Sequence, residues 1–165
     1  MYDDKVEILI VDDALENLEL LGRVLELADF SVRPATSGQA ALQTAQAALP
    51  DLILLDLAMP VMEGFETCRR LQANPATKEV PVIYLTGQGE TEKIVKGFEL
   101  GAVDHITKSF NTTELLRRVS THIELYQLQR SLSREVKTKT DEVQARKSTW
   151  NGPTTSFPLS SRNNS

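Results

Sequence analysis

The sequence lacks several features that would assign it to a specialised class of proteins. It has a single cysteine, Cys68, in 165 residues, which excludes an internal disulfide framework and a cysteine-rich zinc site. It has no excess of basic residues, since 18 Lys and Arg stand against 23 Asp and Glu, and the net charge of −5 argues against a nucleic-acid-binding domain. No apolar run approaches the ~20 residues of a membrane span, and the acidic first residues lack the basic start of a signal peptide. These absences predict one cytoplasmic globular domain.

Short apolar runs are present, and they alternate with helix-length segments. The five runs cover residues 6–11, 31–35, 52–55, 82–85 and 103–106. The first, third and fourth are nearly continuous in Val, Ile and Leu, which is typical of strands buried on both faces of a parallel sheet. The segments between them carry apolar residues at helical spacing, such as Leu18, Leu21 and Leu25. This alternation predicts a doubly wound α/β fold, in which ligands bind at the carboxyl ends of the strands.

Polar residues follow four of the five runs. Asp12 and Asp13 follow the first run, Asp56 the third, Thr86 the fourth and Lys108 the fifth. Clustered carboxylates repel one another unless a cation lies between them, and hard oxygen ligands favour Mg²⁺. A carboxylate can also act as a nucleophile and form an aspartyl phosphate, whose oxygens a lysine and Mg²⁺ would neutralise. Each residue alone has a plainer interpretation as a helix cap, a strand-end hydroxyl or a solvated lysine, but their joint placement favours a site.

Four segments carry a resemblance to a known family. They are ILIVDDALEN, DLILLDLAMPVMEGFE, VPVIYLTG and GAVDHITKSF, and together they span roughly residues 5–125. In order and spacing they resemble the receiver domain of bacterial two-component response regulators. The resemblance implies a flavodoxin-like (βα)5 fold, with a parallel sheet in the order 2-1-3-4-5. We expect the receiver domain at residues 1–125, a helical extension at 126–147 and a disordered tail at 148–165.

The resemblance also implies the roles of the acidic residues. Asp56 matches the phosphoacceptor, Asp13 the direct Mg²⁺ ligand, and Asp12 the acidic neighbour that acts through water. The backbone carbonyl of Ala58 matches the third protein ligand of the metal. By this resemblance the chain is a switch and not an enzyme. A histidine kinase or phosphotransfer protein would phosphorylate Asp56, and the fourth helix, fifth strand and fifth helix would present a face to an effector protein.

The phosphate-binding positions include two departures from the family pattern. Thr86 matches the switch hydroxyl, and Gly87 and Lys108 match the residues that accommodate and pair with the phosphate. Ser109 follows the lysine where the family has proline after a cis bond. A cis non-proline bond costs about 2.5–4 kcal/mol, so the loop either holds that strain or is trans. His105 stands at the switch position, usually Tyr or Phe, and we expect its ring to move inward with a different rotamer bias; a plain strand histidine is the alternative.

The C-terminal part of the sequence predicts one long helix over residues 112–146. Asn111 or Thr112 would cap it, and its apolar positions continue through Leu125, Leu128, Leu132, Val136 and Val143. This narrow stripe favours either a weak coiled coil with a second copy or a fraying helical linker. The segment is similar to linkers that lead to kinase or cyclase output domains, but residues 126–165 are too polar for a second core.

Several interpretations stay open at this point. Asn17 is either a local cap partner or a residue that orients the site, and Cys68 and His122 are interpreted as core and interface residues. An aspartyl-phosphate phosphatase would need a second acid after Asp56, where Leu57, Ala58 and Met59 follow. The remaining alternatives are a pseudo-receiver that never uses phosphate and a fragment of a larger sensor kinase or cyclase.

Overall fold

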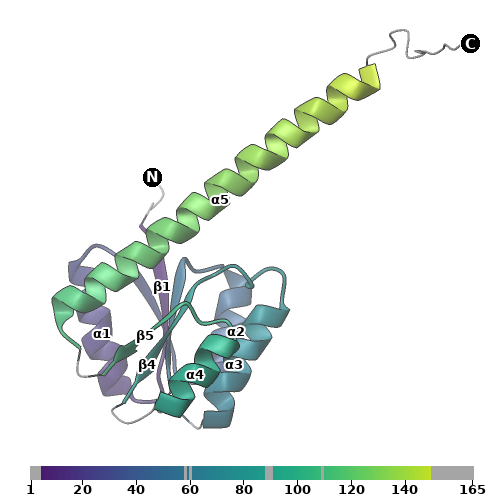
Figure 1. Cartoon of the computed structure of the whole chain (residues 1–165). Helices are drawn as coiled ribbons and strands as arrows, with labels where there is room; N and C mark the ends of the chain where they lie inside the picture. The colour runs from purple at the N-terminus through teal and green to yellow at the C-terminus, as the bar shows by residue number, and fades with distance from the viewer. Residues whose placement is uncertain (1–4, 58, 60, 88–90, 109, 150–165) are drawn as a thin grey trace, which may run out of the picture. The chain divides into compact units, whose positions relative to one another are not determined.

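The computed structural model of the chain describes residues 5–57, 59, 61–87, 91–108 and 110–149 (Figure 1). Within these ranges strands and helices alternate, as the sequence predicts. The elements are β1 (Glu7–Val11), α1 (Leu15–Leu27), β2 (Ser31–Ala35), α2 (Gly38–Ala47), β3 (Leu52–Asp56), α3 (Val61–Ala73), β4 (Val82–Thr86), α4 (Thr91–Glu99), β5 (Asp104–Thr107) and α5 (Thr112–Thr149). The second predicted strand coincides with β2, the first, third and fourth differ from β1, β3 and β4 by one residue at one end, and the fifth is shifted by one residue from β5.

The five strands form one parallel sheet in the order β2-β1-β3-β4-β5, which confirms the predicted fold. β1, β3 and β4 lie inside the sheet and are almost entirely buried, which explains their continuous Val, Ile and Leu. β2 lies at an edge and contains Pro34, which has no N–H to donate to a second neighbour. Apolar character on both faces therefore separates the three inner strands from the two edge strands.

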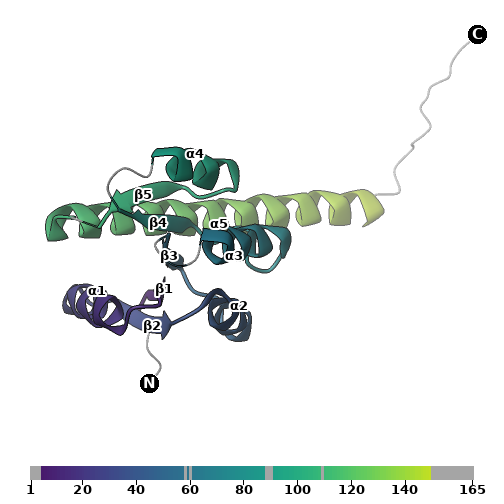
Figure 2. The same cartoon turned by 90° about the horizontal axis from the view of Figure 1, so that it is seen from below.

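Two layers of helices cover the sheet, α1 and the first part of α5 on one face and α2, α3 and α4 on the other (Figure 2). Successive strand residues point to opposite faces. Ile8 and Ile10 accordingly pack with Leu18, Leu25 and Val119, whereas their neighbours along β1 pack under α2 and α3. Cys68 is fully buried in the core between the sheet and the helices α2 and α3, as its interpretation as a core residue predicts.

Side chains cap the first turns of α2 and α5. Ser37 Oγ accepts the N–H of Ala40 at 3.1 Å and caps α2. Asn111 Oδ1 accepts the N–H of Glu114 at 3.1 Å, so Asn111 caps α5 as predicted. α1 begins differently, because its N-cap is Ala14 and no side chain caps it.

The chain divides into two units, residues 1–126 and 127–165. The five strands, the first four helices and the start of α5 belong to the first unit. α5 itself ends at Thr149, three residues beyond the predicted end at residue 146. The expected tail lies mostly outside the described residues, which end at 149. Among the described helices, none has both the length and the apolar composition that crossing a bilayer requires.

Candidate functional site

The register of the sheet brings the acidic residues together. Val11 pairs with Leu55, so Asp12 and Asp56, each the next residue along, lie side by side at the carboxyl edge of the sheet. One carboxylate oxygen from each of Asp12, Asp13 and Asp56 lies within 4.8 Å of the other two. Asp12 and Asp56 are buried, whereas Asp13 is exposed. The three carboxylates predicted from the strand ends therefore form one cluster.

Lys108 joins this cluster from β5. Its Nζ lies 2.7 Å from Asp56 Oδ1, and the Asp56 side chain is only 1% exposed. The N–H of Lys108 donates to the Thr86 carbonyl at 2.7 Å, which attaches the lysine's backbone to the end of β4. A buried carboxylate is costly unless it is paired. The ammonium of Lys108 supplies that pairing at the predicted position.

Thr86, Gly87 and His105 occupy three different environments. Thr86 ends β4 and is fully buried, and its Oγ1 has no hydrogen-bond partner in the described part of the chain. Gly87 follows it and is half-buried. His105 lies on β5 opposite Tyr84, and its half-buried ring meets the Phe98 ring edge-on with centroids 5.8 Å apart. A buried hydroxyl without a partner is uncommon and calls for an explanation. Thr86 Oγ1 is therefore available to form a hydrogen bond with a bound group.

Asn17 adds a contact that the sequence left undecided. Its Nδ2 donates to Asp12 Oδ2 at 3.0 Å, while the Ala14 N–H donates to Asp12 Oδ1 at 2.9 Å. Asp12, Asn17, Lys108 and Thr112 also line a cavity of about 290 Å³, whose apolar walls come from Leu20, Leu21, Val24, Leu85 and Phe110. Asn17 therefore contacts the acidic cluster, which the spacing of five residues from Asp12 alone could not establish.

The donor set suits a hard divalent cation. Three carboxylates meet one ammonium, so the cluster has an excess of negative charge that a cation would neutralise. All three groups offer oxygen, the ligand that Mg²⁺ prefers. The residues present therefore fit Mg²⁺. Two predictions cannot be placed, since Ala58 and Ser109 lie outside the described residues.

The residues around this edge carry the pattern of one protein family. The sequence from residue 8 to residue 120 matches the family described as response regulator receiver domain. The chain belongs to this family. The receiver domain accounts for the sheet order, the helix layers and the acidic cluster together.

Relatives of the receiver domain occur in proteins that are named for different activities. A probable cyclic di-GMP phosphodiesterase of Vibrio cholerae is 40% identical over 117 residues, which are 71% of this chain and 26% of that protein. The DNA-binding dual master transcriptional regulator RpaA of Synechocystis is 39% identical over 112 residues, 68% of this chain and 46% of that protein. This chain thus spans less than half the length of these two relatives, and the likeness lies in their shared receiver domain.

A solved structure shorter than this chain agrees with this assignment. A putative response regulator from Chloroflexus aurantiacus is 38% identical and has a TM-score of 0.70 to this chain. The match covers 73% of this chain and 99% of that one. The likeness therefore extends over a whole receiver-sized protein.

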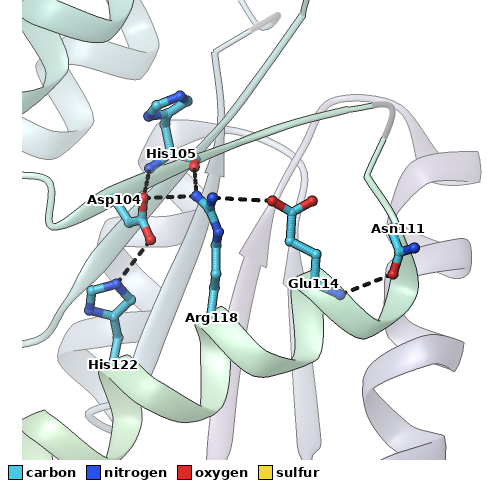
Figure 3. A network of polar contacts seen from close by, with 6 residues as sticks. All are labelled: Asp104, His105, Asn111, Glu114, Arg118 and His122. Atoms are coloured by element: carbon cyan, nitrogen blue, oxygen red, sulfur yellow. Dashed lines mark hydrogen bonds and ion pairs between the residues drawn. The ribbon is translucent and has the colours of Figure 1, made fainter.

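The receiver domain also contains a polar network between β5 and α5, away from the acidic cluster (Figure 3). Asp104 Oδ1 accepts from the His105 N–H at 2.8 Å and from Arg118 Nη1 at 3.1 Å, and Arg118 Nη1 donates to the His105 carbonyl at 2.8 Å. His122 Nε2 lies 3.1 Å from Asp104 Oδ2, and Arg118 also pairs with Glu114. His122 is thus an interface histidine, as interpreted from the sequence.

Proposed function

We propose that this receiver domain accepts a phosphoryl group on Asp56. The supporting observation is a buried carboxylate, 2.7 Å from an ammonium, inside a cluster of three acidic residues. An Asp56 oxygen would attack phosphorus to form an O–P bond, while the P–N bond of a phosphohistidine donor breaks and its imidazole takes up a proton. The donor would be a sensor histidine kinase or a phosphotransfer protein. The chain would assist only its own phosphorylation and dephosphorylation.

Mg²⁺ would be held by Asp12, Asp13, Asp56 and the backbone carbonyl of Ala58. When bound, it neutralises negative charge on the carboxylates and on the phosphoryl oxygens. The clustering of the three carboxylates within 4.8 Å supports this assignment. Thr86, Gly87 and Lys108 would contact the phosphoryl group, and the unpartnered Thr86 hydroxyl supports a hydrogen bond to one of its oxygens.

The signal would pass through the face formed by α4, β5 and α5. We propose that Thr86 moves toward the phosphoryl group and that the His105 ring moves inward after it. The contact between His105 and Phe98 supports a coupling between β5 and α4. Val95, Phe98 and Val103 are 44–55% exposed, which gives an effector protein an apolar surface to bind.

Two finer proposals concern assembly and location. The exposed Leu128 and Leu132 of α5 support a homodimer through a short coiled coil, with a further contribution from the α4–α5 face. The composition supports a cytoplasmic location. Because the relatives are longer, a receiver region of a larger sensor kinase or cyclase remains an alternative.

Intact mass after incubation with Mg²⁺ and acetyl phosphate tests the central proposal. We expect one phosphoryl adduct on the unaltered chain and on Asp29→Asn, a matched substitution at an exposed aspartate. Asp56→Asn should carry none. An unaltered chain that never gains the adduct would instead be a pseudo-receiver, and an adduct that persists in Asp56→Asn would place the phosphoacceptor elsewhere.

A further inference from the structure

Asn17 contacts the acidic cluster from outside the set of expected ligands. It lies in the first turn of α1 and is half-buried. Its backbone N–H donates to the Ala14 carbonyl, as part of the helix start, but its side-chain amide donates to Asp12 Oδ2 at 3.0 Å. The local-cap interpretation would require the side chain to bond the backbone of its own turn. The contact seen here is with the site.

Asp12 is held through both of its carboxylate oxygens. Oδ1 accepts the Ala14 N–H at 2.9 Å and Oδ2 accepts the Asn17 amide. Asp12 is only 1% exposed, so water has little access to replace either donor. A carboxylate oxygen has two lone pairs, and each oxygen of Asp12 therefore keeps one for a further partner. The two donors together set the direction in which those lone pairs point.

We propose that Asn17 is a positioning residue for the divalent-cation site and that it acts through Asp12. This inference rests on the proposed function, because it concerns the same cluster. The amide dipole also offsets part of the repulsion between Asp12 and its two acidic neighbours, which lie within 4.8 Å. Residues that orient metal ligands commonly change metal affinity by about 10–100-fold when removed. We expect about a tenfold effect here.

Calorimetric titration of the unphosphorylated full chain with Mg²⁺ tests the proposal without using activity. Asn17→Ala should bind Mg²⁺ about tenfold more weakly than the unaltered chain. Asn17→Leu, close to asparagine in size and without a donor, should behave in the same way. Asn74→Ala is the matched control, because Asn74 is half-buried like Asn17 and its Oδ1 accepts the Ala76 N–H by a local contact. Its affinity should not change.

Two further readouts separate positioning from a general structural defect. In an Asp12→Ala background, adding Asn17→Ala should change the Mg²⁺ affinity by less than about twofold, since residues that act together are not additive. Phosphorylation of Asn17→Ala by acetyl phosphate should need about tenfold more Mg²⁺ and reach the unaltered rate at saturation. A distorted site would not recover with more Mg²⁺.

The outcomes that overturn the proposal differ from those that overturn the function. Unchanged Mg²⁺ affinity in both Asn17 variants would remove the role of Asn17. So would a full tenfold weakening of Mg²⁺ binding when Asn17→Ala is added to Asp12→Ala. Either result leaves phosphorylation of Asp56 intact. An unaltered chain that binds no Mg²⁺ overturns the metal assignment and the role of Asn17 together.

Discussion

The Tyr84 ring on β4 lies directly against the backbone of Gly97 on α4. Tyr84 is 1% exposed, and a Cβ built on Gly97 would lie 2.2 Å from its Cε2. The Phe65 ring meets the Tyr84 ring edge-on at 6.0 Å and restricts it from the side of α3. α4 can lie this close to the sheet only because residue 97 has no side chain.

Gly97→Ala should therefore destabilise the domain although alanine favours helices. Overpacking a closely packed core costs about 1–3 kcal/mol, against a helix-propensity gain of at most about 1 kcal/mol. We expect a net loss of about 1–2 kcal/mol in urea unfolding. Gly22→Ala is the control, because its Cβ would meet Val32 at 3.9 Å, an ordinary contact. Equal effects of the two substitutions would contradict this account.

The buried phenol of Tyr84 also makes the stability of the domain depend on pH. Burial, with the neighbouring Cys68 thiol, raises the pKa of Tyr84 well above its ordinary value. The folded chain thus keeps the neutral phenol, whereas the unfolded chain ionises it near pH 10. The contribution of the neutral Tyr84 phenol to the free energy of unfolding is therefore full below about pH 10 and falls as the pH rises further. From pH 8 to 11, the unaltered chain should lose about 1 kcal/mol more unfolding free energy than Tyr84→Phe. Parallel losses would contradict the prediction.

Residues that follow strands could be predicted from the sequence, whereas residues that depend on helix packing could not. Asp12, Asp56 and Lys108 lie where their strands end, and parallel strands end at one edge. The role of Asn17 depends on how α1 starts, and the Tyr84–Gly97 contact on how close α4 lies to β4. The spacing of apolar residues along the sequence determines neither of these two distances. The sequence could therefore supply the candidate ligands and two alternatives for Asn17, but it could not decide that the Asn17 amide contacts Asp12.

At the scale of elements, β5 and α5 are joined by charge as well as by apolar packing. Asp104 contacts the His105 backbone, Arg118 and His122, and its side chain is 22% exposed. Strand β5 has only four residues and lies at an edge of the sheet. The Asp104 carboxylate thus connects this strand to α5 in addition to the apolar packing of Ile106 with α5.

Asp104→Ala should destabilise the domain by about 1–2 kcal/mol, because it removes the acidic partner of His122 and one of the two acidic partners of Arg118. Asp104→Asn keeps one acceptor oxygen and should lose less. The control is Glu66→Gln on α3, where Glu66 pairs with Arg69 and Arg70 at the surface. Exposed pairs contribute little, so no measurable change in thermal unfolding is expected there. A loss in Glu66→Gln as large as in Asp104→Ala would contradict the distinction.

At the scale of the whole molecule, helix α5 continues past residue 126, the last residue of the first unit, to Thr149. Leu128 and Leu132 lie four residues apart and therefore share one face of α5. Their side chains are 55% and 51% exposed. Apolar residues at such spacing are stable in water chiefly when a partner helix covers them. The long polar remainder of the helix explains why the sequence predicts either a weak association or a helical linker, and not a second core.

We expect the full chain to form a dimer whose population rises with concentration in sedimentation velocity. Leu128→Asp with Leu132→Asp removes two apolar residues from each copy and introduces repelling charges, so the dimer should weaken by at least about 100-fold. Leu27→Asp is the matched control, since Leu27 on α1 is 89% exposed and lies outside α5. It should associate like the unaltered chain. If the unaltered chain stays monomeric at several hundred micromolar, α5 acts as a helical linker. If Leu27→Asp abolishes the dimer, the interface lies on the receiver domain.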